Sequence, residues 1–138
     1  ESGAICRYFE ELPPEPPLMG TTPKEKAEVE MWHRRIDWYL VIPVGSCFQH
    51  TTGYFKDRMK PIPEWGEESG KAARAFLTVL EDRLGESSYI AGENFSIADI
   101  AALCALDFAR LVKIRPSDEQ IHLTRWLEVV KGRPSVGA

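Results

Sequence analysis

Histidine, cysteine and acidic side chains at helical spacing are the first candidates for chemistry in this sequence. Cys47 and His50 stand one helical turn apart, and His33 and Asp37 form a similar pair nearby. Each pair could supply two ligands to a metal ion, but a structural or catalytic zinc requires three or four converging donors. We find no further cluster beside either pair, and no nucleophile elbow, phosphate-binding loop or paired carboxylates. The sequence therefore predicts neither a metal site nor a catalytic residue in this chain.

The acidic residue with the most specific setting is Asp99, and its spacing favours a structural role. Ser96 can cap the first turn of a helix, while Asp99, at the third helical position, reaches back to the Ser96 amide. Phe95 and Ile100 flank this capping box and could clamp across it as a hydrophobic staple. Although any buried helix could begin this way, we expect replacement of Ser96 or Asp99 by Ala to cost about 1 kcal/mol each, and more if the cap is buried.

Length, charge and cysteine content limit the classes of protein to which this chain can belong. The 138 residues suffice for one domain with a real core, and no run approaches the roughly 20 apolar residues of a membrane helix. The net charge of -4, with the cations spread along the chain, argues against a nucleic-acid or anionic-membrane partner. Three scattered cysteines with apolar neighbours predict reduced thiols in the core of a cytoplasmic protein; they are Cys6, Cys47 and Cys104.

The elements that must position these residues are all predicted to be helical. The first helix covers residues 2–12 and stops at a cluster of prolines, Pro13, Pro14, Pro16 and Pro17. A second, long helix begins with the cap Thr22-Pro23-Lys24-Glu25 and continues to a kink or break near Val41 to Pro43, followed by a helical stretch to about residue 52.

Three further helices follow a loop over residues 53–63. One extends from residue 64 to Gly85, which is a good left-handed C-cap, and the capped helix follows at residues 96–112. Because that helix is apolar almost all round, it must lie at the centre. The last helix covers residues 118–131 and stops at Gly132. With no convincing strand, the fold class is all-α, a bundle of about five helices.

These pieces together resemble the C-terminal helical domain of cytosolic glutathione transferases. The resemblance rests on Glu1-Ser2-Gly3-Ala4-Ile5 before a proline-rich linker, on Tyr89-Ile90-Ala91-Gly92 before Phe95-Ser96-Ile97-Ala98-Asp99, and on Trp126 before Gly132-Arg133-Pro134. It implies that residues 1–12 are the last helix of a thioredoxin-like domain, 13–22 a linker and 23–138 the helical domain.

The same resemblance implies that Glu1 and Ser2 bind the gamma-glutamyl end of glutathione. A helix start suits a carboxylate, and Glu1 could pair with the ammonium group beside it. The strands, the loop with the cis-proline and the group that activates the glutathione sulfur would all lie upstream of Glu1, so we expect this truncated chain alone to be inactive. For the isolated chain, the interpretation of Glu1 and Ser2 as a simple helix cap is favoured, and for a full enzyme their interpretation as glutathione-binding residues is favoured.

In the family, the second helix lines the pocket for the electrophile. By that resemblance the candidates for substrate binding are Trp32, Arg35, Tyr39 and Phe48, which offer aromatic surface and one cation to a flat, electron-poor or anionic molecule. The alternatives are that Trp32 and Tyr39 belong to the core stripe of this helix and that Arg35 lies on a solvated face.

Two functions remain open. The first is the helical domain of a dimeric, cytoplasmic transferase that conjugates or reduces electrophiles with glutathione as co-substrate, a role in detoxification. The second is a non-catalytic module for protein interaction, as in the translation factors and tRNA synthetase complexes that resemble transferases. If a covering domain is missing, we expect an exposed apolar patch on the first helix and the inner face of the second.

Overall fold

The computed structural model describes residues 1–12 and 16–136, and the regular backbone in these ranges is helical. The elements in chain order are α1 (Ser2–Glu10), α2 (Pro23–Ile36), the π-helical turn η1 (Asp37–Val41), α3 (Ile42–Thr51), α4 (Pro63–Glu86), α5 (Ile97–Ala109), the 3-10 turn η2 (Arg110–Val112) and α6 (Ile121–Lys131). In the described part of the chain, strand-like pairing is limited to one isolated bridge between Tyr89 and Gly92. The predicted all-α bundle is confirmed.

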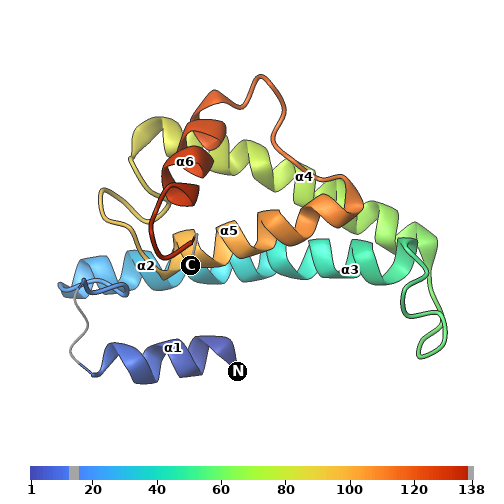
Figure 1. Cartoon of the computed structure of the whole chain (residues 1–138), viewed down its shortest axis with the longest axis horizontal. Coiled ribbons are helices and arrows are strands. Elements are labelled where there is room, and N and C mark those ends of the chain that lie inside the picture. Colours follow the sequence, from blue (N-terminus) through green and yellow to red (C-terminus); the bar gives the residue numbers. More distant parts are fainter. Residues whose placement is uncertain (13–15, 137–138) are drawn as a thin grey trace.

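The helix α5 lies at the centre of the bundle. It packs against α2, η1 and α3 on one side and against α6 on another, while α4 covers α3 and α6 (Figure 1). Four alanines at helical spacing, all buried, let neighbouring backbones approach α5 closely; they are Ala98, Ala102, Ala105 and Ala109. The prediction that the capped helix is central is therefore confirmed.

The start of α5 is held by a fully buried carboxylate. Asp99 Oδ2 accepts hydrogen bonds from the Ser96 amide at 2.9 Å and the Ser96 hydroxyl at 3.0 Å, within the expected capping box. Its Oδ1 accepts from the Ile90 amide at 3.0 Å and from Trp126 Nε1 at 2.8 Å. One side chain thus ties together the loop before α5, the first turn of α5 and the middle of α6.

The second capping box is also confirmed, and the chain continues through Pro43 without a break. The Glu25 amide donates to Thr22 Oγ1 at 3.2 Å and the Glu25 carboxylate accepts from the Thr22 amide at 3.1 Å. Ahead of Pro43, the Ile42 amide bonds to the Asp37 carbonyl, five residues back. Because proline cannot donate and its ring crowds the preceding turn, widening the helix into a π turn there lets the chain proceed into α3.

Several sequence-based details are wrong at helix ends. Gly85 is not a left-handed cap: α4 continues to Glu86, and a Cβ at Gly85 would lie 3.3 Å from the His122 ring, so this glycine serves close packing against α6. The helix predicted from residue 118 begins at Ile121, where Glu81 of α4 accepts from the amides of His122 and Leu123 at 3.1 and 2.8 Å.

The cysteine prediction holds in part. All three thiols are free, and Cys47 is buried, but Cys6 and Cys104 are exposed. Cys6 lies on α1, which buries none of its residues, and Cys104 lies on α5 beside the same cavity as Cys6. Pro13 and Pro14 of the predicted linker fall outside the described residues.

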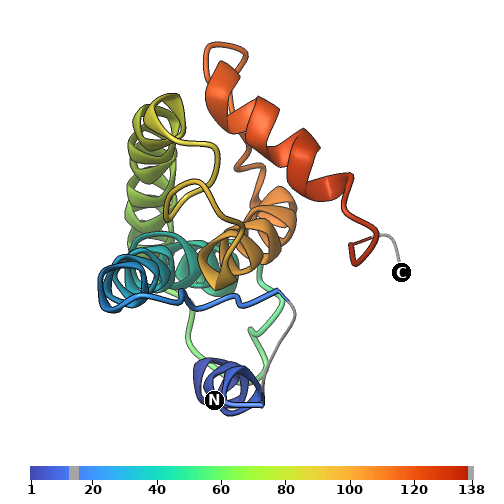
Figure 2. The same cartoon turned by 90° about the vertical axis from the view of Figure 1, so that its left-hand side faces the viewer.

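The helix α1 stands apart from the rest of the bundle (Figure 2). Arg7 pairs with Glu30 of α2 at 3.3 Å, and the Glu10 carboxylate accepts from the amides of Leu18 and Met19 at 3.0 and 2.8 Å. One apolar stripe, which starts on α1 and continues just beyond its end, remains at least half exposed; it consists of Ile5, Tyr8 and Phe9 of α1 and of Leu12, and we call it the stripe of α1. This confirms the expected apolar patch on the first helix.

On the side of α2 facing α1, His33 is buried, and this desolvation lowers the pKa of its imidazole below the ordinary 6.5. The negative charges of Asp37, whose Oδ1 lies 4.0 Å from His33 Nε2, and of Glu30 oppose this lowering of the pKa. The positive charges of Arg34 and Arg7 add to it. The unfolded chain therefore takes up a proton at His33 more readily than the folded chain does.

We predict that removing Asp99 destabilises the domain severely. Asp99→Ala leaves four buried donors unpaired and should lower the free energy of unfolding by about 3 kcal/mol or more, and Trp126→Phe, which removes one of those donors, by about 1–2 kcal/mol. Urea denaturation measures both. Asp82→Ala, at an exposed carboxylate of α4, is the control and should stay within about 0.5 kcal/mol of the parent. If Asp99→Ala unfolds like this control, the anchoring role is wrong.

We further predict that the domain loses stability as the pH falls through 6.5, because His33 must be deprotonated to stay buried. The unfolding free energy should drop by up to about 1.4 kcal/mol per pH unit below the unfolded pKa. In His33→Phe this component should vanish. Urea denaturation of both proteins at a series of pH values between neutrality and mild acid measures this dependence. Equal slopes of unfolding free energy against pH in the two proteins would contradict the role of His33.

Candidate functional site

The candidate glutathione-binding residues lie at the open N-terminus of α1. Glu1 is the N-cap and Ser2 the first helical residue; the Glu1 side chain makes no capping hydrogen bond, and both residues are exposed. They line a hollow of about 530 Å³ between α1 and the α2–η1 segment, and its lining combines charged side chains with the apolar Trp38, Val41 and Ile42. We call it the polar hollow because, unlike the neighbouring cavity, it is lined by several charged groups. A helix start with a free hydroxyl beside it suits a carboxylate ligand.

On the α2 side, this hollow is lined by a network of paired charges. Arg34 pairs with Glu30 at 3.1 Å and with Asp37 at 3.0 Å, and Glu30 also meets Arg7 of α1. Because each guanidinium faces a carboxylate, the wall offers both donors and acceptors at little net charge. Such a lining fits a zwitterionic ligand better than a simple anion.

An apolar cavity of about 370 Å³ adjoins the polar hollow. The cavity lies between α1, the α2–η1–α3 rod and α5, and shares with the hollow Ser2, Gly3, His33, Asp37 and Val41. Its other walls are apolar side chains and two thiols, among them Val44, Ile100, Cys104 and Phe108. A polar compartment thus opens directly into an apolar one.

An aromatic cluster continues from the cavity toward the end of the bundle. The Phe108 ring lies 5.1 Å from that of Phe48, which in turn lies 5.5 Å from Tyr54 and 6.2 Å from Phe55. Sequence reasoning selected Phe48 but missed the other three. Tyr54 and Phe55 are adjacent aromatic residues in a predicted loop, and this could have marked them as candidates for substrate binding. Phe108 could not be singled out, because nearly every side of its predicted helix is apolar.

The other three substrate-binding candidates lie elsewhere. Trp32 is buried, Arg35 stacks over its ring at 4.2 Å, and Tyr39 packs 5.6 Å from Phe76 of α4. They form a group with α4 that does not include Phe48. Trp32 therefore has the core position foreseen as its alternative, and a role for these three in substrate binding remains a prediction.

The two His-containing pairs are occupied by structural contacts. His50 Nδ1 accepts from the Ile62 amide at 3.0 Å, which ties the loop after α3 to that helix, and Cys47 packs against Gly70 of α4. Nowhere in residues 1–12 and 16–136 do three potential metal ligands converge. Nor does any helix of the described chain have the length and apolar character needed to cross a bilayer.

Comparison with known proteins adds independent evidence. Residues 48–134 match the family model described as "Glutathione S-transferase, C-terminal domain". Glutathione S-transferase 2 of Saccharomyces cerevisiae is 33% identical over 99% of this chain, and the chain covers 59% of that protein. The crystal structure of yeast Gtt2 superposes with a TM-score of 0.93, covering 99% of this chain and 67% of that one.

A second group of relatives carries a different name. Elongation factor 1-gamma of Danio rerio is 26% identical over 97% of this chain, which covers 29% of that protein. This chain thus spans less than two thirds of the length of either curated relative. The match extends over most of the chain in sequence and nearly all of it in structure, so the chain belongs to the glutathione S-transferase family and is its C-terminal helical domain.

Proposed function

We propose that this chain is the helical half of a cytoplasmic glutathione transferase that conjugates or reduces hydrophobic electrophiles. The observation that carries the proposal is the polar hollow at Glu1 and Ser2 that opens into the apolar cavity between α1 and α5. Glutathione is a polar peptide with one reactive sulfur, and its partner is apolar. Two adjoining compartments of these characters suit the two substrates.

The division of the chain is part of the same proposal. Residues 1–12 would end a thioredoxin-like domain, 13–22 would connect it, and 23–138 would form the helical domain. The exposed stripe of α1 supports this, because an isolated helix with a half-exposed apolar stripe needs a covering surface. Trp38, Val41 and Ile42, also exposed, extend apolar surface along the neighbouring rod, where they line the polar hollow. The homodimer is part of the proposal without a surface assigned to it.

The activity is tested in the complete gene product with glutathione and 1-chloro-2,4-dinitrobenzene. We expect Ser2→Ala to raise the KM for glutathione by about tenfold, since a hydrogen bond to a charged ligand is lost. Phe108→Ala should raise the KM for the electrophile instead. Ser117→Ala and Trp65→Ala, at exposed positions outside the cavity, are the matched controls. A complete product without glutathione-dependent activity would rule out the transferase.

A non-catalytic docking module is the second candidate, and the elongation factor 1-gamma relatives favour it. Such a module has no need to retain glutathione. Calorimetric titration of the complete product with glutathione distinguishes the two: saturable binding that Ser2→Ala weakens supports the transferase, whereas no binding favours docking.

We also predict that the 138-residue chain on its own self-associates through the stripe of α1. Burying these side chains against a second copy removes apolar area from water. Phe9→Glu should shift the chain toward monomer in sedimentation velocity, and Trp65→Glu, an equal change at an exposed ring of α4, should not. A strictly monomeric parent would contradict the prediction.

A further inference from the structure

Two of the three free thiols line the same cavity. Cys6 of α1 and Cys104 of α5 both belong to the wall of the apolar cavity of about 370 Å³, and both residues are exposed. The third thiol, Cys47, is buried and packs against Gly70 of α4. The fold thus brings two accessible thiols, from distant parts of the sequence, to one space.

Helical spacing places both thiols on the cavity side of their helices. On α1, Gly3 and Cys6 lie one turn apart and both line the cavity. This side of α1 faces the bundle, because a Cβ at Gly3 would lie 3.3 Å from Arg34 Nη2 of α2. On α5, Cys104 stands in the middle of the lining stripe within residues 97–108. The two thiols therefore face the same space from two different helices.

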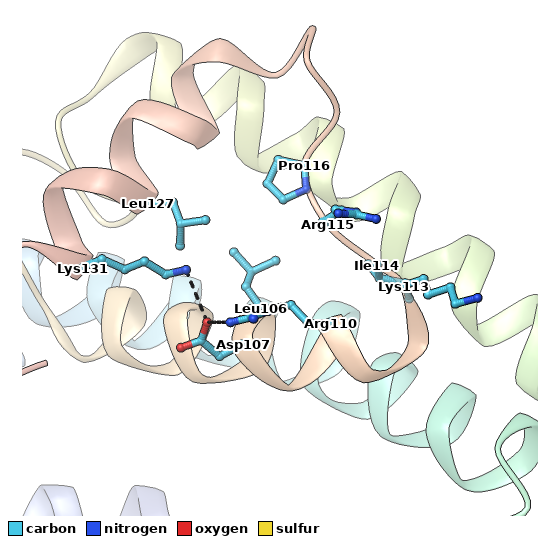
Figure 3. A pocket seen from close by; sticks show the side chains of 9 residues that line it. All are labelled: Leu106, Asp107, Arg110, Lys113, Ile114, Arg115, Pro116, Leu127 and Lys131. Carbon is cyan, nitrogen blue, oxygen red and sulfur yellow. Dashed lines mark ion pairs between the residues drawn. The ribbon is translucent and has the colours of Figure 1, made fainter. Parts of the chain in front are cut away.

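The pocket on the opposite side of α5 is lined by other chemistry. In Figures 1 and 2, α6 and α1 lie on opposite sides of α5. The pocket beside α6, of about 320 Å³, is lined by charged and apolar side chains without a thiol (Figure 3). Asp107 Oδ1 there lies 3.8 Å from Arg110 Nη1 and 3.4 Å from Lys131 Nζ, so these cations are paired. The two accessible thiols thus both lie on the α1 side of α5.

The helix that carries Cys6 can approach α5 at little cost. No residue of α1 is buried, and the helix is held by the ion pair between Arg7 and Glu30 and by the Glu10 carboxylate. An exposed ion pair contributes little to stability. A disulfide requires its two Cα atoms to lie within about 7 Å of each other. Movement of α1 as a unit can supply this approach.

The polar hollow gives a suitable oxidant a place beside the thiols. It opens into the cavity through shared lining residues, among them Ser2, which lies one turn before Cys6. Its paired charges fit a zwitterionic peptide. Glutathione disulfide with one half bound in the hollow would present its sulfur–sulfur bond to Cys6 before Cys104.

We propose that Cys6 and Cys104 are a redox-active thiol pair whose oxidant is glutathione disulfide. The choice of this oxidant rests on the proposed glutathione site, whereas the pair itself does not. The Cys6 thiolate attacks one sulfur of glutathione disulfide, which forms a bond between Cys6 and one glutathione and releases the other as a thiolate. The Cys104 thiolate then attacks the Cys6 sulfur, forms the bond between the two cysteines and releases the second glutathione. Both cysteines are oxidised, the glutathione disulfide is reduced to two glutathione molecules, and these take up the protons that the cysteines lost.

The test treats the 138-residue chain with glutathione disulfide at low protein concentration and follows free thiols and intact mass. We expect the three free thiols to fall to one, and peptide mapping to find Cys6 joined to Cys104 within one chain. Cys104→Ser should instead retain one glutathione on Cys6. Cys47→Ser, at the buried thiol, is the matched control and should form the bridge at the parental rate. Because Cys6 and Cys104 are exposed, serine at either position should leave the fold intact, as circular dichroism verifies.

Hydrogen exchange shows whether the bridge holds α1. The amides of α1 should exchange at least about tenfold more slowly in the oxidised chain, because the bridge restrains a helix that is otherwise marginal. Reduction with dithiothreitol should restore the faster exchange. In Cys104→Ser, the bound glutathione should leave α1 exchanging as fast as in the reduced parent.

A second disulfide reagent separates the thiol pair from the proposed transferase. The oxidation rates with glutathione disulfide and with 2-hydroxyethyl disulfide are each divided by the rate of the urea-unfolded chain with the same reagent. Glutathione disulfide should have at least about a tenfold advantage, since the hollow binds it. Ser2→Ala should remove this advantage, and Ser117→Ala should not. If the bridge forms with equal relative rates for both reagents, the pair stands, but glutathione disulfide is not its particular oxidant and the glutathione site is contradicted.

Three outcomes would overturn the thiol pair itself. One is that both reagents leave Cys6 and Cys104 unbridged in the parent chain. Another is a disulfide that joins two chains at low protein concentration in place of the bridge within one chain. The third is unchanged hydrogen exchange of α1 in the bridged chain, which would mean that the bond forms only in the unfolded protein.

Discussion

The buried Asp99 carboxylate is the interaction on which the bundle most depends. Four donors converge on its two oxygens, and they come from the loop before α5, the cap of α5 and the indole of α6. Burial raises the pKa of this carboxyl, and the four hydrogen bonds oppose that shift. A charge that is costly to bury is tolerated because every donor around it would otherwise lack a partner.

This anchor fixes the position of α5, and α5 in turn separates two surfaces of different character. On one side, the α2–η1–α3 rod and α1 enclose a polar and an apolar hollow. On the other, α6 and the segment after η2 enclose a pocket at whose edge Arg110 and Lys131 pair with Asp107. The alanine face of α5 lets its neighbours approach closely. Both surfaces are therefore built on one rigid element, which is a sound basis for binding geometry.

The least integrated element is α1, and this bears on function. It is attached by an ion pair, by the Glu10 carboxylate and by little apolar contact, while its own apolar stripe faces outward. A helix in this state is only marginally stable without further packing. The residues proposed to meet glutathione lie at its start, so their geometry depends on what packs against α1.

The sequence determined the fold class, both capping boxes and the central place of α5, because these follow from local spacing and periodicity. The kink or break expected near Pro43 is a π turn that joins α2 to α3 without interruption. Only the tertiary structure decided which distant groups meet: Trp126 on Asp99, Glu81 on the start of α6, His122 against Gly85, and Phe108 with Phe48. It also separated Trp32, Arg35 and Tyr39 from Phe48 and brought Lys131 of α6 to Asp107 of α5. Helical periodicity shows which side of a helix is apolar, but not which neighbour that side contacts, since the contact is set by how the helices pack.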